Sequence, residues 1–420
     1  MVALPFLYFG FLALRFYRKS RRIDLAVYIA LIYAVSGLFS ILVDAFGLRS
    51  ADTLNYQISL VASLVYCFSI SLFLFPIHKY SKYYFSGVKP LSSDKALRTI
   101  AIVGFLYSIF YIVMSLGSLR FALTSDISEL RGDLYSGMVE VGWVGSLPAI
   151  IRMPVSLLNH AVGSAWVFQL LAFYALFVQR MPKKYGYMLF TISLLSPLSG
   201  IIGVDRSNAT YWVLSLIGCY FFFKPFVGDK DRKGIINYGL VLLGLVLAYL
   251  WVVTDSRFGE SGIYDDSTTS IVDYLGKPFI NFCYFYDDFT SPNRYSGILF
   301  PFLSNVFGSD SYSVIYWQER LSDLTGISVG TFYTFLGAIK IALGKIGMYA
   351  YVIVVSVLGS VLIKPNQSYT ITLYKLYVFF LLSSVPMLGL FGHYYSGSVK
   401  SFCAALFFII TLLLSRRVSR

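Results

Sequence analysis

The sequence predicts an all-α, polytopic integral membrane protein with about eleven transmembrane helices. Of its 420 residues, 57% are hydrophobic and only 13% are charged, which gives a mean hydropathy of +0.70. Apolar runs close to the thickness of a hydrocarbon core recur along the chain, and short alternating segments typical of a β-barrel do not dominate. The basic residues behind the net charge of +13 cluster between the apolar runs. This placement follows membrane topology, so no nucleic-acid partner is expected.

The apolar runs set the order of the expected helices. They lie at 2–14, 23–43, 54–77, 98–118, 161–179, 186–203, 208–223, 234–253, 346–363, 371–391 and 399–414. The first run is short for a full crossing. Basic residues follow every odd-numbered run, and by the positive-inside rule those segments all lie in the cytoplasm. The two longest segments between runs, 119–160 and 254–345, are then both external.

This topology divides the chain into three parts. Residues 1–253 form an N-terminal bundle of about eight spans, and residues 346–420 form a C-terminal bundle of about three. Between them, residues 254–345 form one large, late external loop, rich in polar, aromatic and charged residues. A bilayer core would leave its polar groups unsatisfied, so we expect this loop in water or lining a wet cavity.

Metal and cofactor chemistry has no motif in this sequence. Of the four cysteines, only Cys283 lies in a predicted wet segment, and it has no partner there for a disulfide or a metal framework. The three histidines have no ligand spacing, and no Walker loop, dinucleotide fingerprint or zinc pattern occurs. We therefore expect no metal and no cofactor.

Residues 119–142 carry the pattern of an amphipathic helix on the outer membrane surface. Apolar residues recur at steps of three and four, and acidic residues, including Glu129, occupy the opposite face. Arg131 lies between the two faces, where its guanidinium reaches headgroup level, and Arg120 projects from nearly the same side three turns earlier. The alternative is an interfacial helix whose arginines pair with its own acids.

The short external turn at 203–208 is the second candidate. Ser207 or Asn208 is expected to cap the next helix and to leave Arg206 beside the electropositive N-terminus of that helix. Two positive sources together favour an anion site. The alternative is a topological anchor in which Asp205 neutralises Arg206.

The large loop supplies the third set of candidates. Arg257 follows the eighth run directly, between Asp255 and Glu260, while Arg294 and Arg320 are further long donors. Rings beside carboxylates suit a sugar, although an interfacial belt has the same composition. The aromatic residues of the loop are Phe258, Tyr264, Tyr274, Phe279, Phe282, Tyr284, Phe285, Tyr286 and Tyr295.

Three passages resemble the bacterial O-antigen or oligosaccharide repeat-unit polymerases (the Wzy type). They are Glu129-Leu-Arg131-Gly132, the turn from Gly203 to Ser207, and 274–282 followed downstream by 329–334. The resemblance extends to the whole architecture, because that family has ten to fourteen spans and one large, late periplasmic loop. Relatives often carry an acidic residue where this chain has Gly344-Lys345-Ile346-Gly347.

The resemblance implies a multi-pass protein of the bacterial inner membrane that transfers a growing glycan between undecaprenyl-pyrophosphate-linked units. A chain-length regulator and a flippase are the implied partners. The candidates for the catalytic base are Glu129, Asp255 and Glu260. The candidates for pyrophosphate binding are Arg131, Arg206 and Arg257, because arginine forks stabilise a leaving pyrophosphate without a metal. Further substrate contacts are expected from Arg120, Arg294, Arg320 and Tyr274. A lipid-linked oligosaccharide flippase or transporter and an O-antigen ligase are the alternatives.

Overall fold

Helices are the only regular secondary structure in the described part of the chain. The computed structural model describes residues 1–49, 53–124, 143, 147–203, 205–258, 267–290, 321–323, 325–327, 332–365, 370–396 and 398–416. Within these ranges the only strand-like pairing is an isolated parallel bridge between Val88 and Ile371. The predicted all-α class is therefore confirmed for this part of the chain.

Two compact units make up the molecule, and each combines segments that are distant in sequence. Unit 1 consists of Met1–Ser86, Thr268–Tyr369 and Val378–Ala404. Unit 2 consists of Gly87–Ser267, Thr370–Tyr377 and Ala405–Arg420. Helices α16 (Leu373–Leu388) and α17 (Ser398–Arg416) contribute residues to both.

Three long helices begin unit 1: α1 (Leu4–Ser20), α2 (Leu25–Ala45) and α3 (Leu60–Gly87). One buried carboxylate ties them together. Asp24 caps α2 by accepting a hydrogen bond from Val27 N at 2.9 Å, and its other oxygen lies 2.9 Å from Nδ1 of His78 on α3. The His78 ring stacks on Phe16 of α1, with ring centroids 4.2 Å apart. The carboxylate is fully buried but has partners on both oxygens, as a buried charge requires.

Helix α12 (Ser267–Asp288) contains Pro278, which removes a backbone donor and disturbs the preceding turn. Hydroxyls of α2 satisfy carbonyls of that turn. Ser36 Oγ donates to the Leu275 carbonyl and Ser40 Oγ to the Gly276 carbonyl, each at 2.7 Å. A proline is tolerated in a helix of a membrane protein when side-chain hydroxyls compensate in this way.

The contact between α12 and its neighbours is tight and apolar. A Cβ atom on Gly276 would lie 2.5 Å from the Phe39 carbonyl oxygen, so glycine allows the two backbones to approach. One turn later, the Phe279 and Phe282 rings lie 5.1 and 5.3 Å from the Tyr66 ring of α3. All three rings are buried. Helix α12 is therefore a core element of unit 1.

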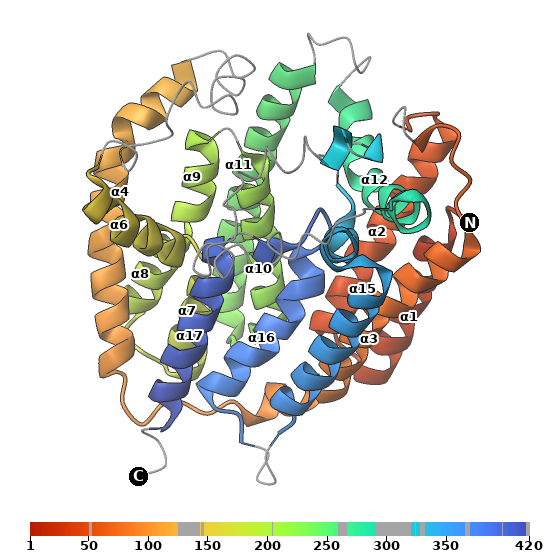
Figure 1. Cartoon of the computed structure of the whole chain (residues 1–420). Coiled ribbons are helices and arrows are strands. Elements are labelled where there is room, and N and C mark those ends of the chain that lie inside the picture. The colour runs from red at the N-terminus through yellow and green to blue at the C-terminus, as the bar shows by residue number, and fades with distance from the viewer. Residues whose placement is uncertain are drawn as a thin grey trace. The chain divides into compact units, whose positions relative to one another are not determined.

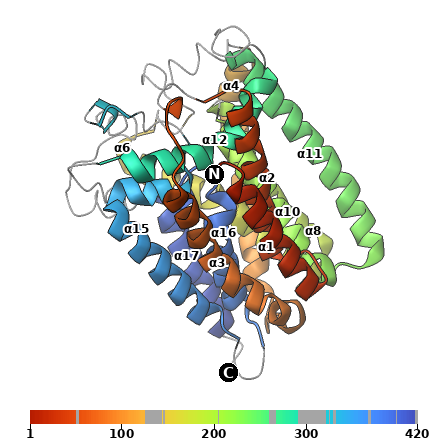
Figure 2. The same cartoon turned by 90° about the vertical axis from the view of Figure 1, so that its right-hand side faces the viewer.

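Helix α15 (Thr334–Ile363) is broken at Gly344, where φ is 74° and ψ is 178°. This backbone conformation is accessible almost only to glycine. In both views, the second half of α12 and the arm of α15 before Gly344 lie side by side, across the direction of α2 and α3 (Figures 1 and 2). The two crossing segments share an apolar cluster that includes Phe285, Phe289 and Ile341.

Within the stretch 254–345, which we expect in water or lining a wet cavity, residues 267–288 form the helix α12 and several of its side chains are buried. Phe279, Phe282 and Cys283 are fully buried, so neither the two rings nor the thiol faces water. The polar residues that suggested a loop include Asp273 and Lys277, which form an ion pair one turn apart in the helix. Because the two charges neutralise each other, a charge count overestimates how polar the segment is.

Unit 2 is built from two long helices and several shorter ones, with a buried polar contact among three of them. The helices are α4 (Lys95–Thr124), α6 (Ala149–Val162), α7 (Ala165–Phe173) with a π-helical turn (Tyr174–Val178), α8 (Lys183–Ser193), α9 (Leu195–Ile202), α10 (Arg206–Phe223) and α11 (Asp229–Phe258). Gln169 of α7 donates to the Trp212 carbonyl of α10 at 3.0 Å, and the Trp212 indole donates to Ser193 Oγ of α8 at 3.1 Å. These bonds join three helices through buried polar groups.

Six of the described helices are long and apolar enough to cross a membrane. They are Leu25–Ala45, Leu60–Gly87, Lys95–Ala122, Lys183–Ile202, Asp231–Val253 and Thr334–Ile363. A seventh span results if Ile150–Val162 and Ala165–Val178, bent by 50°, cross as one. Helices occupy all eleven predicted apolar runs. The number of crossings nevertheless stays a prediction for the remaining, shorter helices.

Candidate functional site

Many of the site residues expected from the sequence lie outside the described part of the chain. These are Glu129, Arg131, Glu260, Arg294 and Arg320. Asp255 and Arg257 belong to the last turns of α11, but their side chains also fall outside the description. Arg120 is exposed near the end of α4. Arg206 and Tyr274 can be described in detail, and they belong to different units.

Arg206 is the first residue of α10, directly after a tight turn. The expected cap, Ser207 or Asn208, is wrong, because the helix starts earlier and Asp205 occupies the N-cap. The Asp205 carboxylate accepts from Ser207 N at 2.8 Å and from Ser207 Oγ at 2.7 Å. Both of its oxygens therefore bind Ser207, and half-buried Arg206 lies at the positive end of the helix dipole.

Gly200 makes this turn possible. Asp205 N donates to the Gly200 carbonyl at 2.8 Å, which closes the connection between α9 and α10. A Cβ atom on Gly200 would lie 2.7 Å from the Asp205 carbonyl oxygen, closer than real Cβ atoms come. The position of Arg206 is thus fixed by the backbone of the turn as well as by the cap.

Tyr274 lies on α12, half-buried, with its ring edge-on to Phe332 at a centroid distance of 4.8 Å. The Lys277 ammonium lies 6.0 Å from the Tyr274 ring centre. Asn281, one turn further on, donates to the Phe332 carbonyl at 2.8 Å. Tyr274 therefore helps to hold the segment before α15, and its role in substrate binding stays a prediction.

A polar cluster that the sequence did not reveal surrounds the C-terminal end of α12. We call it the α12-end cluster, and its members are Tyr56, Tyr286, Asp287, Lys340, Lys345 and Tyr349. All six residues belong to unit 1. They come from the segment before α3, from the last turn of α12 and from both sides of the break in α15, so the crossing segments bring them together (Figures 1 and 2).

Lys340 is the buried centre of this cluster. Its side chain is 4% exposed, and its ammonium donates to the Phe285 carbonyl and, at 2.5 Å, to the Phe289 carbonyl. These carbonyls belong to the end of α12, where the helix dipole is negative. The Asp287 and Asp288 carboxylates lie within electrostatic reach. The lysine therefore caps α12 and ties it to the short arm of α15.

Tyr56 connects the α12-end cluster to the segment after α2. Its hydroxyl donates to Asp287 Oδ2 at 2.5 Å, and its ring packs edge-on against Tyr284 at 5.3 Å. Burial, together with the hydrogen bond to Asp287, raises the pKa of the Tyr56 hydroxyl. The phenol therefore keeps its proton and holds the carboxylate in place as a hydrogen-bond donor.

The other side of the cluster faces the break in α15. Tyr286 and Tyr349 share a hydrogen bond of 2.5 Å between their hydroxyls, and exposed Lys345 lies 4.4 Å from the centre of the Tyr286 ring. Burial and the bond to Tyr349 raise the pKa of Tyr286. The protonated Tyr286 phenol of α12 and the Lys345 cation thus lie together beside the part of α15 that follows Gly344.

A buried histidine lies on the segment between α16 and α17. His393 Nε2 is 3.0 Å from the Tyr351 hydroxyl of α15, and the side chain is 8% exposed. Burial lowers the pKa of His393 to about 4, so the ring is neutral at physiological pH. It acts as a hydrogen-bonding partner in the core of unit 1 and not as a cation.

One sequence signal could have pointed to the α12-end cluster. Lys340 lies in an otherwise apolar run of about ten residues. Burying a charged side chain in such a run costs free energy unless a polar partner binds it. Its partners are backbone carbonyls more than fifty residues earlier, and sequence spacing does not encode that contact. Asp287 was overlooked for the same reason, because Tyr56 lies on a different element.

Fold and composition together define a multi-pass helical membrane protein, with several apolar helices long enough to span a bilayer. Among the described residues, no group of three or more His, Cys, Asp or Glu side chains is arranged to hold a metal ion. No family model matches the chain, and neither a curated protein nor a solved structure matches it significantly.

Proposed function

We propose that the chain is a membrane glycosyltransferase of the O-antigen polymerase type. It joins undecaprenyl-pyrophosphate-linked oligosaccharide repeat units into O-antigen of lipopolysaccharide, or into capsular polysaccharide or exopolysaccharide. The bond between the growing glycan and the donor pyrophosphate breaks, and a new glycosidic bond forms to a hydroxyl of the acceptor's terminal sugar. The hydroxyl proton passes to a carboxylate base, and undecaprenyl pyrophosphate leaves. The reaction uses neither a metal nor a cofactor.

The observation that carries this proposal is the position of Arg206. A guanidinium at the first position of an apolar helix combines a bidentate donor with the positive end of the helix dipole. A leaving pyrophosphate needs stabilisation of this kind as negative charge develops on it. Arg131 and Arg257 are proposed to complete the pyrophosphate site, and Glu129, Asp255 or Glu260 to supply the base.

The topology belongs to the same proposal. Eleven spans with a cytoplasmic C-terminus place 119–160, the 203–208 turn and 254–345 on the periplasmic face of the bacterial inner membrane. The α12-end cluster, with its crossing segments, then lies on that face as well. Both polyprenyl tails enter from the outer leaflet, and a flippase and a chain-length regulator are the proposed partners.

Two other functions use the same substrates, namely a lipid-linked oligosaccharide transporter and an O-antigen ligase. A transporter requires charged side chains along a path through the spans. Lys340 is a charged residue in a candidate span, but it lies on the arm before Gly344 and caps α12, so its presence is explained without transport. The ligase differs from the polymerase in its acceptor, a lipid core, and an experiment separates the two.

The test uses the purified chain in proteoliposomes that contain lipid-linked repeat units, with a chelator and without any nucleotide sugar. The polymerase yields products longer by whole repeat units. A second reaction offers a lipid core as the acceptor, and a third follows whether intact units cross the membrane.

Transfer only to the lipid core would make the protein a ligase, and movement of unaltered units would make it a transporter. Lengthening that occurs only after a divalent ion is restored would keep the polymerase but refute metal-independent chemistry. An unchanged substrate on one face of the membrane would refute all three functions.

A further inference from the structure

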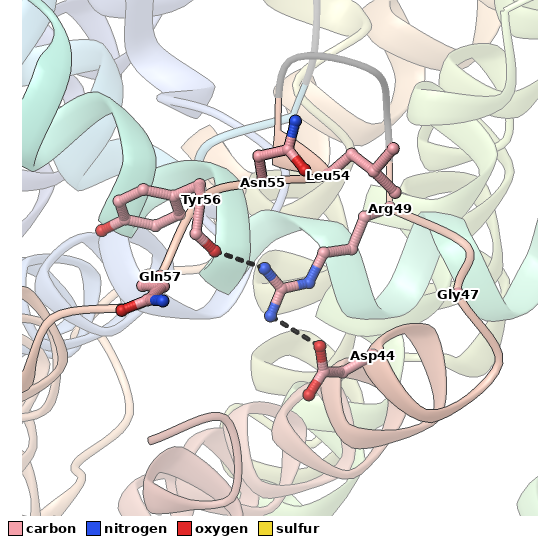
Figure 3. A pocket seen from close by; sticks show the side chains of 7 residues that line it. All are labelled: Asp44, Gly47, Arg49, Leu54, Asn55, Tyr56 and Gln57. Carbon is pink, nitrogen blue, oxygen red and sulfur yellow. Dashed lines mark hydrogen bonds and ion pairs between the residues drawn. The ribbon is translucent and has the colours of Figure 1, made fainter.

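A small open cleft lies where α2 ends, next to the α12-end cluster (Figure 3). Its volume is about 390 Å³, which falls at the small end of the range of ligand pockets, roughly 300–1,000 Å³. Such a volume accepts one small ligand. The residues that line the cleft are Asp44, Gly47, Arg49, Leu54, Asn55, Tyr56 and Gln57.

The end of α2 shapes one wall of this cleft. Gly47 has a φ of 68°, a left-handed conformation in which glycine commonly terminates a helix. Gly47 N donates to the Asp44 carbonyl at 3.3 Å, and Leu48 N donates to the Val43 carbonyl at 2.9 Å. The chain therefore turns back sharply after α2 and returns Arg49 to the side chain of Asp44.

Arg49 is held in place and its charge is neutralised. Nη2 lies 2.6 Å from Asp44 Oδ1, and Nη1 donates to the Tyr56 carbonyl at 2.6 Å and to the Thr53 carbonyl at 3.3 Å. Figure 3 shows the guanidinium between Asp44 and the Tyr56 carbonyl. The Nε atom of Arg49 is buried with no hydrogen-bond partner among the described atoms.

This pairing selects against an anion. A pyrophosphate group in the cleft would have to compete with the Asp44 carboxylate for the guanidinium and would be repelled by it. A neutral ligand meets no such barrier. The Asp44 side chain, which lines the cleft, is 43% exposed against 13% for Arg49, so its carboxylate stays accessible as an acceptor for hydroxyl groups.

The remaining lining fits a polyhydroxylated ring. Asn55 and Gln57 are exposed amides, and each offers both a donor and an acceptor, as sugar hydroxyls require. Leu54 is 58% exposed and supplies an apolar contact for C–H groups. The Tyr56 hydroxyl binds Asp287 of α12. Tyr56 therefore belongs both to the cleft lining and to the α12-end cluster.

We propose that this cleft is a carbohydrate subsite that binds one neutral sugar ring of the lipid-linked glycan. The inference rests on the proposed polymerase function and assigns the sugar to residues other than those proposed to bind the pyrophosphate. Asp44 accepts hydrogen bonds from ring hydroxyls, while Asn55 and Gln57 set which hydroxyl pattern is accepted. Arg49 positions Asp44 and does not contact the pyrophosphate.

Saturation-transfer NMR on the purified full chain measures this binding directly. The probes are free glucose, galactose, N-acetylglucosamine and rhamnose, with inorganic pyrophosphate as the anionic probe. We expect at least one sugar to bind, and we expect Asp44→Asn and the double variant Asn55→Ala/Gln57→Ala to weaken that binding about tenfold, the equivalent of one or two lost hydrogen bonds. Pyrophosphate binding is expected to stay unchanged in both variants.

The matched control is Asp94→Asn, which removes the carboxylate of another half-exposed Asp–Arg pair, with Arg98, outside the cleft. It is expected to leave sugar binding unchanged. The double variant replaces exposed side chains, so its fold should be retained, and thermal unfolding checks this. Binding of none of the four sugars, or wild-type sugar binding in the double variant, would overturn the subsite. Loss of pyrophosphate binding in the variants would make the cleft an anion site and also overturn the proposal.

The same samples separate this inference from the proposed function. Sugar binding that depends on the cleft, in a protein that lengthens no glycan, would retain the subsite and refute the polymerase. Lengthening by wild-type protein, together with unaltered sugar binding in the cleft variants, would retain the polymerase and refute the subsite.

Discussion

The position of Arg206 is set by its neighbours in the turn between α9 and α10. Its place at the start of α10 depends on Asp205, which caps the helix. It also depends on Gly200, because the turn leaves no room for a Cβ atom at that position. The sequence revealed the arginine beside a helix start but placed the cap two or three residues too late. The cap is the residue just before the helical backbone angles begin. A sequence pattern locates this start only to within one or two residues.

At Arg206, we predict that Arg206→Lys lowers the rate of glycan lengthening roughly tenfold to a hundredfold. Lysine keeps the charge but loses the planar fork, and a charge-assisted hydrogen bond contributes about 1.5–3 kcal/mol. The measurement is the initial rate with lipid-linked units. The control is Arg98→Lys, which affects a half-exposed pair with Asp94 and should leave the rate within about twofold. A wild-type rate in Arg206→Lys would exclude Arg206 from the pyrophosphate site.

His393 makes stability depend on pH. Its pKa is lowered to about 4 in the folded protein, against 6.5 in the unfolded chain, so the unfolded state binds a proton first as the pH falls. The stability contribution is complete above pH 6.5 and is lost progressively down to about pH 4, a total of about 3 kcal/mol. Thermal unfolding of wild type and His393→Gln across this window measures it. Equal pH slopes in the two proteins would contradict the prediction.

At the scale of elements, two residues give unit 1 its crossing segments. Pro278 disturbs α12, where hydroxyls of α2 satisfy carbonyls of the preceding turn, and Gly344 breaks α15. The existence of helices followed from the length of the apolar runs for all eleven predicted runs, because a long apolar run is recognised without knowing its contacts. The fold of 267–288 did not follow, because its burial depends on α2 hydroxyls and on the pairing of Asp273 with Lys277.

We predict that Gly344→Ala destabilises the protein by about 1–3 kcal/mol, since a Cβ atom is strained at a φ of 74° and a ψ of 178°. Open space around this glycine means that strain, and not a clash, is the cause. Gly239→Ala in α11 is the matched control. That position is helical and also open, so alanine should be neutral or stabilising by about 0.5–1 kcal/mol. Equal unfolding temperatures for the two variants would contradict the account of the break.

For the whole molecule, the basic residues that follow the odd-numbered apolar runs predict which ends of the helices face the cytoplasm. The number of spans depends on whether the shorter helices cross the membrane. Reporter fusions after Phe289 and after Arg420 should report opposite sides, with Phe289 external and the C-terminus cytoplasmic. Two signals from the same side would remove the eleven-span topology and, with it, the external position of the α12-end cluster.

The sequence could define the membrane class and most helices, but it could define the candidate site only in part. Arg206 and Tyr274 were recognisable because they lie beside local signals, a helix start and an aromatic run. Lys340, Asp287 and Tyr56 were not, because their contacts join elements fifty to more than two hundred residues apart. A buried ion or cap of this kind is defined by packing, and packing is absent from a linear pattern.

The length of the glycan product made in proteoliposomes tests the central claim most directly. Donor units carry a radiolabel, the acceptor is the same lipid-linked unit, and reactants are supplied to the outer face only. The polymerase reading predicts a ladder of labelled products spaced by one repeat unit, with undecaprenyl pyrophosphate released in equal amount to the bonds formed. A single labelled band at the length of the starting unit would contradict the polymerase function, provided that a thermal-unfolding experiment shows the protein to be folded.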